Sequence, residues 1–392
     1  MKTLRKVTVI ATALAVALNL AACTGTTGSV APDNNSGATG NTTGAVNDTA
    51  EGSSDKIQIV TTIFPEYDWV MQVLGDKADN AEVTMLLDNG VDLHSYQPSV
   101  DDIAKIGSCD LFIYVGGESD EWVEDVLAAK TNPDLKAINL LEVLGDSVKE
   151  EEVVEGMEHE HDHDHEDADH EDDDHEDDDH EDADHEDHDH EDADHEDHDH
   201  EYDDHEDHDH EEEPEMDEHV WLSLRNAGIL VDAIAEDLAS IDSENADTYL
   251  ANAAAYNDEL AKLDDAYKEA VENASLNTIV VADRFPFRYL VDDYDLQYYA
   301  AFAGCSAESE ASFDTILFLS DKTKEIGTDN ILVIEGKDHN VADTVAENAG
   351  LGSDSVLVLD SLQSTTSTDF ANGVTYLTVM QQNLEVLKEA LN

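Results

Sequence analysis

Residues 246–271, ADTYLANAAAYNDELAKLDDAYKEAV, determine how the rest of this chain is arranged. Asp242 and Ser243 precede the segment and are N-cap candidates. The apolar spacing predicts one helix of roughly 30 residues, which is about 45 Å long at a rise of about 1.5 Å per residue. Few globular helices are so long, and a helix of this length can bridge two lobes. Its predicted apolar side consists of Ala246, Tyr249, Leu250, Ala253, Tyr256, Leu260, Leu263, Tyr267 and Val271.

Strand and helix patterns alternate on both sides of this helix. Before it, we expect strands at 56–62, 82–87, 110–115 and 137–141, and helices at 66–74, 121–129 and 225–241. After it, we expect strands at 278–282, 331–335 and 356–359, and helices at 312–323, 341–349 and 374–391. This alternation predicts mostly parallel sheets covered by helices. The predicted fold class is therefore α/β, with two lobes joined by one long linking helix.

The N-terminal sequence is typical of an export signal. A basic start is followed by the apolar residues 7–20, and Leu-Ala-Ala-Cys closes the segment at Cys23. These four residues resemble a bacterial lipobox, which implies that Cys23 is lipidated and becomes the mature N-terminus. We therefore predict a signal peptide at 1–22, a lipid-anchored flexible tether at 23–55, an N-terminal lobe at 56–224, helices at 225–276 and a C-terminal lobe at 277–392. An insertion at about 151–217 interrupts the first lobe.

The formal net charge of −78 is unevenly distributed. Residues 151–220 contain 42 of the 96 Asp and Glu and no Lys or Arg, so this one segment carries more than half of the net charge. Such an acidic balance argues against nucleic acid or an anionic membrane surface as a partner.

The same insertion holds 16 of the 19 histidines, and from His165 to His210 a histidine recurs every fifth residue. This period fits neither helix nor strand, and the scarcity of apolar residues predicts disorder without metal. Imidazole and carboxylate together suit zinc and neighbouring transition metals. We expect low-affinity, unselective metal binding; the alternatives are an acidic spacer or a repeat expansion without function. The histidines of this His-rich tract are His159, His161, His163, His165, His170, His175, His180, His185, His188, His190, His195, His198, His200, His205, His208 and His210.

Three histidines lie outside the tract: His94, His219 and His339. Each lies near the end of a predicted strand or opens a loop, where α/β sheets place their ligands. A single histidine at such a position is more often merely hydrogen-bonded or exposed. Position alone therefore does not assign a function to them.

Two motifs around these histidines resemble one family. Residues 90–98, Gly-Val-Asp-Leu-His-Ser-Tyr-Gln-Pro, resemble Gly-x-Asp-Pro-His-x-Tyr-x-Pro, the first-lobe metal motif of the zinc and manganese solute-binding proteins. Residues 217–222, Asp-Glu-His-Val-Trp-Leu, resemble its second motif, Asp-Pro-His-x-Trp-Leu, and Leu93 and Glu218 replace the prolines. The family's acidic His-rich loop also lies just before its second ligand. The resemblance covers residues 56–392 and implies a metal ion in the cleft between two lobes, with His94 and His219 as ligands.

The second lobe departs from the family pattern. Residues 283–289, Asp-Arg-Phe-Pro-Phe-Arg-Tyr, replace His-x-Ala-Phe-x-Tyr and put Arg284 on the ligand position, where a guanidinium cannot bind a cation. Asp283 is either a ligand or a helix N-cap. A later loop, residues 335–339, supplies the family's last ligand, and His339 would complete a three-histidine zinc set. The candidate ligands are His94, His219, His339 and Asp283, with Asp338 and Glu335 as further ligands or as groups that orient a histidine.

The resemblance implies an extracytoplasmic receptor that captures Zn²⁺ and delivers it to the permease of an ABC importer. A manganese or iron receptor (Mn²⁺ or Fe²⁺), a surface metal store or adhesin, and a zinc hydrolase are the alternatives. We expect no enzyme, because the histidine pair is spread over separate motifs instead of lying along one helix. We expect a monomer held at the cell membrane by its lipid anchor. Cys109 and Cys305 are either a disulfide or free thiols.

Overall fold

The computed structural model describes residues 56–157, 215–306, 310–336 and 339–392. The first lobe is built on a sheet of parallel strands in the order β2-β1-β3-β4. These strands are β1 (Ile57–Thr61), β2 (Ala81–Met85), β3 (Leu111–Tyr114) and β4 (Lys136–Asn139). Its helices are α1 (Phe64–Leu74), α2 (Val100–Ser108), α3 (Trp122–Ala128) and α4 (Leu140–Leu144).

The second lobe repeats this plan with the parallel order β6-β5-β7-β8. Its strands are β5 (Thr278–Arg284), β6 (Gln297–Phe302), β7 (Ile331–Val333) and β8 (Val356–Val358). Its helices are α7 (Arg288–Asp293), α8 (Phe313–Ile326), α9 (Asn340–Ala349), α10 (Ser367–Ala371) and α11 (Tyr376–Ala390). The prediction of two α/β lobes is confirmed, and every strand pairing in the described residues of these sheets is parallel.

Both faces of each sheet are buried, as parallel sheets require. Neighbouring strand residues point to opposite faces. Ile59 therefore joins a large core shared with α1, α5 and α6, while Val60 joins a smaller cluster with α2 and α3. In the second lobe, Val281 likewise belongs to the large core, while Val280 packs with α8 and α9 in another small cluster. The large core contains buried residues of both lobes, so it runs continuously from one to the other.

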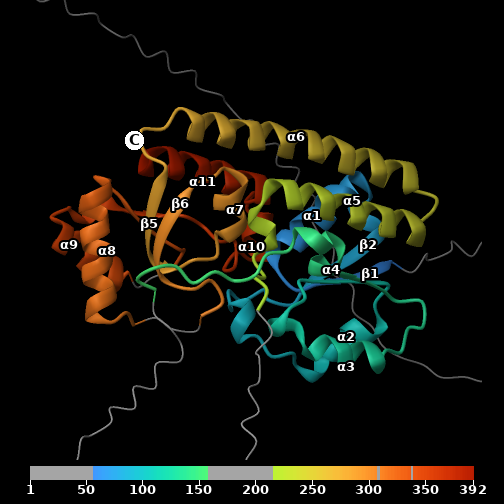
Figure 1. The fold of residues 1–392 in the computed structure, drawn as a ribbon. Helices are drawn as coiled ribbons and strands as arrows, with labels where there is room; N and C mark the ends of the chain where they lie inside the picture. Colours follow the sequence, from blue (N-terminus) through green and yellow to red (C-terminus); the bar gives the residue numbers. More distant parts are fainter. Residues whose placement is uncertain (1–55, 158–214, 307–309, 337–338) are drawn as a thin grey trace, which may run out of the picture. The chain divides into compact units, whose positions relative to one another are not determined.

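The long helix joins the lobes as predicted. After α5 (Leu224–Ile241), α6 (Ala246–Glu272) extends for 27 residues. In its first half, the Tyr256 hydroxyl donates to Asp68 of α1 at 3.1 Å. Near its end, the Tyr267 hydroxyl donates to the carbonyl of Met380 in α11 at 2.6 Å. Figure 1 shows α6 passing α5 and α1 at one end and α11 at the other.

The predicted N-cap of this helix was wrong. Asn245 occupies the cap position, and Asp242 ends α5 instead. The Asp242 carboxylate accepts from the side chains of Asn245 at 2.7 Å and Tyr249 at 2.8 Å. Its oxygens are thus used by side chains of the turn and not by the first backbone N–H groups of α6.

Several elements were not predicted from the sequence, among them α2, α7 and β6. The segment that forms β6, QYYAAF, contains two alanines, which are poor strand formers. Pairing with β5 along most of its length overrides this weak local preference. The omission matters because β6 leads directly to Cys305.

The two ends of the predicted insertion belong to the described fold. We call residues 149–157 and 215–217 the stem. Glu151 N donates to Glu215 O, and Asp217 N donates to Lys149 O, each at 2.9 Å, so the two ends form an isolated antiparallel β-bridge. The stem therefore brings together the described residues that flank the His-rich tract.

The stem also crosses to the second lobe. Lys149 pairs with Asp292 at 2.6 Å. Glu152 pairs with Arg288 at 3.2 Å and accepts from the Tyr298 hydroxyl at 3.1 Å. Figure 1 shows this green segment running from the first lobe toward β5 and α8. An insertion of the first lobe is thus bonded to the second.

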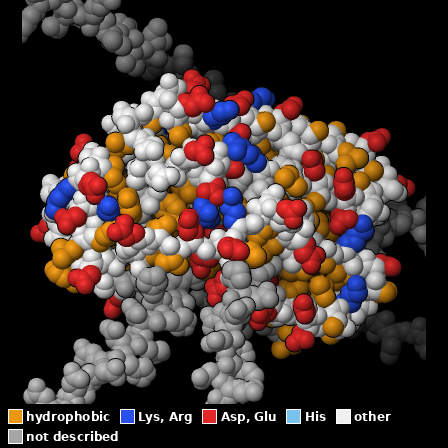
Figure 2. All heavy atoms as spheres, viewed as in Figure 1, with side chains coloured by type: hydrophobic (Ala, Val, Ile, Leu, Met, Phe, Trp, Pro, Cys, Tyr) orange, Lys and Arg blue, Asp and Glu red, His pale blue; other side chains and the backbone are white. Residues whose placement is uncertain are grey.

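Several predictions concern residues outside the described ranges: the signal peptide, Cys23 and the tether, the His-rich tract from His159 to His210, and Asp338. In the ranges that are described, no helix combines the length and apolar character needed to cross a membrane. Figure 2 shows acidic side chains spread over the viewed face, with smaller groups of Lys and Arg between them. The acidic character therefore extends beyond the tract to the folded body.

Two leucines of α6 test the packing of the linking helix. Leu260 is 2% exposed and Leu250 is 45% exposed. We expect Leu260→Ala to lower the free energy of unfolding by about 2–5 kcal/mol, because it leaves a cavity in the shared core. The matched control, Leu250→Ala, should change it by about 0.5 kcal/mol or less. Urea unfolding measures both, and equal losses would contradict the assignment of the buried face.

Candidate metal centre

His94 lies in the loop after β2, in a short 3-10 turn over Leu93–Ser95. Asp92 caps this turn, because its carboxylate accepts from the backbone N–H of His94 at 3.0 Å. The strand order reverses between the neighbours β1 and β3, and such switch points place ligands at the carboxyl ends of strands. Local capping and sheet topology together bring the His94 ring to the site.

His219 follows the stem and is fully buried. The carboxylate of Asp217 accepts from the backbone N–H of His219 at 2.8 Å and lies 3.1 Å from its Nδ1. Trp221, two residues later, donates through Nε1 to the carbonyl of Ser361 in the second lobe at 2.9 Å. The turn that carries His219 is thus fixed on both sides.

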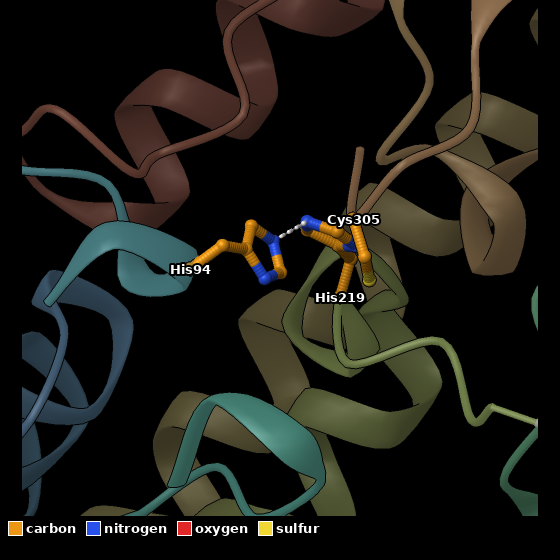
Figure 3. A group of neighbouring side chains, drawn as sticks. All are labelled: His94, His219 and Cys305. Atoms are coloured by element: carbon orange, nitrogen blue, oxygen red, sulfur yellow. Dashed lines mark hydrogen bonds between the residues drawn. The ribbon is translucent and has the colours of Figure 1, made fainter. Parts of the chain in front are cut away.

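The two histidines meet at their Nε2 atoms, which lie 3.2 Å apart. Two ligands bound to a tetrahedral zinc ion at about 2.0–2.1 Å would lie about 3.3–3.4 Å apart. The observed separation therefore fits two ligands of one ion. In the described residues, Cys305 joins them, and the three ligand atoms lie within 4.8 Å of one another. Figure 3 shows His94 approaching from one side, with His219 and Cys305 on the other.

Glu218 and Ser119 orient the ring of His94. The Nδ1 atom of His94 lies 2.9 Å from the Ser119 hydroxyl and 3.3 Å from the Glu218 carboxylate. An Nδ1–H that donates to these oxygens leaves the lone pair of Nε2 for a metal ion. Glu218 stands where the resembling motif has a proline, so this departure supplies an anchoring carboxylate.

Gly117 leaves room for the Glu218 carboxylate. Gly117 has φ +79°, and a Cβ atom there would lie 2.4 Å from Oε1 of Glu218. That oxygen accepts from the backbone N–H of Ser119 at 2.8 Å. A larger residue at 117 would displace Glu218 from His94.

Charge and burial shift the protonation of the site. Burial alone would lower the pKa of His94, but the hydrogen bond that its ring donates to Glu218 and the charge of Asp92 raise the pKa above its usual value of 6.5. Burial opposes ionisation of Glu218, yet its bonds to His94 and Ser119 lower its pKa. Burial, with the nearby Glu218, raises the pKa of Asp120 to about 7. The site is thus a buried group of anions around two imidazoles.

Arg284 makes an ion pair between the lobes. Its guanidinium lies 2.6 Å from the Asp92 carboxylate, on the residue that caps the His94 turn. Although burial opposes it, this contact lowers the pKa of Asp92. The arginine that replaces the expected histidine thus fixes a first-lobe loop and does not bind the ion itself.

The other predicted second-lobe ligands are not members of the three-residue group. Asp283 is in β5, and its carboxylate accepts from the backbone N–H groups of Arg284 and Ile334 at 2.8 and 3.3 Å, so it is no helix N-cap. The Glu335 carboxylate accepts from the backbone N–H of Ser361 at 2.6 Å and from its hydroxyl at 2.8 Å. His339 precedes α9. Burial raises the pKa of Asp283, and the hydrogen bonds from Arg284 and Ile334 and the nearby His339 oppose this rise only in part.

Cys305 was not recognised as a candidate ligand. It follows the carboxyl end of β6 after Gly304, whose Cβ would lie 2.8 Å from the Phe285 carbonyl and 3.2 Å from the His219 ring. The available signal was a cysteine just after the apolar run 298–302, but β6 itself was missed. Cys305 and Cys109 are free thiols, and Cys109 is buried in the first lobe.

A two-lobed α/β fold with a group of metal-ligating side chains between its lobes defines the class of metal-binding solute receptors. The chain belongs to the ZnuA family, "Zinc-uptake complex component A periplasmic", whose model matches residues 59–390.

Known relatives agree with this membership. The zinc-binding lipoprotein AdcA of Streptococcus pneumoniae (strain R6) is 30% identical over 334 residues, covering 85% of this chain and 56% of AdcA. The chain thus spans about half the length of this relative. The high-affinity zinc uptake system protein ZnuA of Bacillus subtilis is 28% identical over 342 residues, covering 87% of this chain and 90% of ZnuA.

A solved structure shows the same fold. The Zn(II)-bound ZnuA-like domain of S. pneumoniae AdcA matches with a TM-score of 0.59 and 27% identity, over 86% of this chain and 99% of that domain.

Removal of either site histidine should abolish tight metal binding. We expect one tight zinc equivalent in a protein lacking residues 158–213, and its loss in His94→Ala and in His219→Ala, because each removes one of the paired Nε2 ligands. Isothermal titration measures this. His339→Ala is the matched comparison, because His339 lies outside the group. Tight binding that survives both changes would show that the ion binds elsewhere, and an equal loss in His339→Ala would add His339 to the ligands.

Zinc binding should weaken as pH falls. A histidine must be neutral to bind the ion, and the pKa of His94 is raised above 6.5, so protons compete at a higher pH than for free histidine. Below that pKa we expect a loss of about tenfold per pH unit for each protonated ligand. Titrations of the same deletion protein between about pH 8 and pH 5 measure this, and flat affinity would mean that histidine does not dominate the site.

Proposed function

We propose that this chain is an extracytoplasmic receptor that captures zinc between its lobes and delivers it to the permease of an ABC importer. The main support for this proposal is that the Nε2 atoms of His94 and His219 lie 3.2 Å apart. The Nδ1 atom of each ring contacts a buried carboxylate. This is the arrangement in which proteins hold zinc ligands. The names of AdcA and ZnuA, which describe zinc binding and zinc uptake, support the same cargo.

The proposed action is binding and release without chemical conversion. His94 comes from the first lobe and His219 from the segment next to the stem, so an ion that binds both ties these segments together. We propose a lipid anchor at Cys23, with residues 24–55 as the tether that lets the body reach the permease. We expect no hydrolase activity and a monomeric receptor.

The His-rich tract is proposed as a low-affinity collector that supplies this site. The stem pairs its two ends, and Asp217 is only two residues from His219. A cavity of about 280 Å³ is lined by His94 and Glu218 and also by Glu215 and Met216 of the stem. Ions on the tract are therefore tethered close to the cleft, at an effective concentration of about millimolar for a short flexible link.

Zinc uptake by cells tests the receptor and the collector together. In a strain that depends on this chain, we expect normal zinc uptake with the full chain and reduced uptake in scarce zinc when residues 158–213 are deleted. Uptake should be lost with His94→Ala, because the tight site is gone. Radioactive zinc accumulation and growth in chelated medium measure this.

Titration of the purified proteins separates the two proposals. The full chain should show one tight event followed by several weak ones, and the deletion should remove only the weak ones. Equal stoichiometry with and without the tract, in excess zinc at neutral pH, would exclude the collector. Full uptake with His94→Ala would exclude the receptor site itself.

A further inference from the structure

The position of Cys305 is the starting observation. Its Sγ lies within 4.8 Å of one ring nitrogen of His94 and of one ring nitrogen of His219. A tetrahedral zinc ion with two nitrogens and one sulfur would place sulfur about 3.6 Å from each nitrogen. Each of these distances therefore exceeds the tetrahedral spacing by no more than about 1.2 Å. Figure 3 shows the cysteine beside the ring of His219.

The loop that carries Cys305 is fixed from both sides. Its backbone N–H donates to the Glu151 carboxylate of the stem at 2.8 Å. The opposite side of the stem, residues 215–217, leads directly to His219. Gly304 lets the loop approach the His219 ring, because any side chain there would meet that ring and the Phe285 carbonyl. The stem thus fixes both the loop that carries Cys305 and the segment that carries His219.

Three other polar groups of the second lobe are already engaged. Arg284 is a cation paired with Asp92. The Asp283 carboxylate accepts from two backbone N–H groups, and Glu335 accepts from the loop that begins at Ser361. In the described part of the second lobe, the sulfur of Cys305 is the ligand atom that lies within 4.8 Å of a ring nitrogen of both imidazoles.

We infer that Cys305 is a ligand of the captured ion, together with His94 and His219, and that its thiolate sets the choice of metal. This inference rests on the proposed function and specifies its site. On binding, the thiol proton passes to solvent and a sulfur–metal bond forms, because a coordinating thiol is deprotonated. Thiolate with imidazole selects zinc, whereas manganese prefers carboxylate and water oxygens. The cysteine thus favours a zinc receptor over a manganese receptor.

Cobalt substitution of the full chain tests the sulfur ligand. Thiolate-bound Co²⁺ has a sulfur-to-metal charge-transfer band in the near ultraviolet, and the His-rich tract contains no cysteine to produce it. We expect this band at one Co²⁺ per chain and its loss in Cys305→Ser. The matched controls, Cys109→Ser and Cys23→Ser, remove the remaining cysteines and should keep it.

Zinc affinity gives the second measurement. Cys305→Ser should weaken the tight zinc event by about 100-fold or more, because the loss of a mere orienting group costs about 10–100-fold. Cys305→His keeps a ligand at this position and should retain tight zinc binding without the band. This variant keeps the test decisive if the serine variant does not fold.

The outcomes distinguish the two levels of the proposal. Tight zinc binding that depends on His94, combined with an absent band or a band that survives Cys305→Ser, would overturn the sulfur ligand and leave the receptor intact. A full chain without any tight zinc event would overturn both. A band lost only with Cys305 would support the inference.

Discussion

The close approach of His94 and His219 is the contact on which the rest of the structure depends. Two nitrogen lone pairs facing each other across 3.2 Å repel unless a proton or a cation lies between them. The rings are held in place because the opposite edge of each contacts a buried carboxylate, Asp217 or Glu218. The two Nε2 atoms are thus held close together in advance, which would lower the ordering cost of binding an ion between them.

The two lobes act as the frame for this contact. The large hydrophobic core runs through both, and α6 is hydrogen-bonded to the first lobe in its first half and to the second lobe near its end. Packed interiors resist compression and transmit strain. Loops from separate strands therefore keep their relative positions, which a site assembled from distant residues requires. The stem adds a further link, because it belongs to the first lobe in sequence and bonds to the second in space.

Electrostatics explain why so acidic a site tolerates its own charge. Burial and a neighbouring carboxylate raise the pKa of Asp120 to about 7, while the Arg284 ion pair keeps Asp92 ionised. One carboxyl group thus takes up protons near neutral pH and another has its own cation. A divalent ion between the imidazoles would stabilise the remaining anions, and the acidic body surrounding the site favours the approach of cations.

The sequence by itself determined the two α/β lobes, the long helix between them and the two motifs that contain His94 and His219. These features depend on local periodicity and short motifs, which are written in consecutive residues. The tertiary structure alone placed Cys305 beside the histidines and directed Arg284 to Asp92. It also showed the Asp283 and Glu335 carboxylates bonded within their own lobe. The physical reason is that three-dimensional contacts between loops depend on sheet order and on how lobes pack, and neither is encoded in the spacing of residues along the chain. Even the missed strand β6 follows this rule, because its pairing with β5, and not its own composition, makes it a strand.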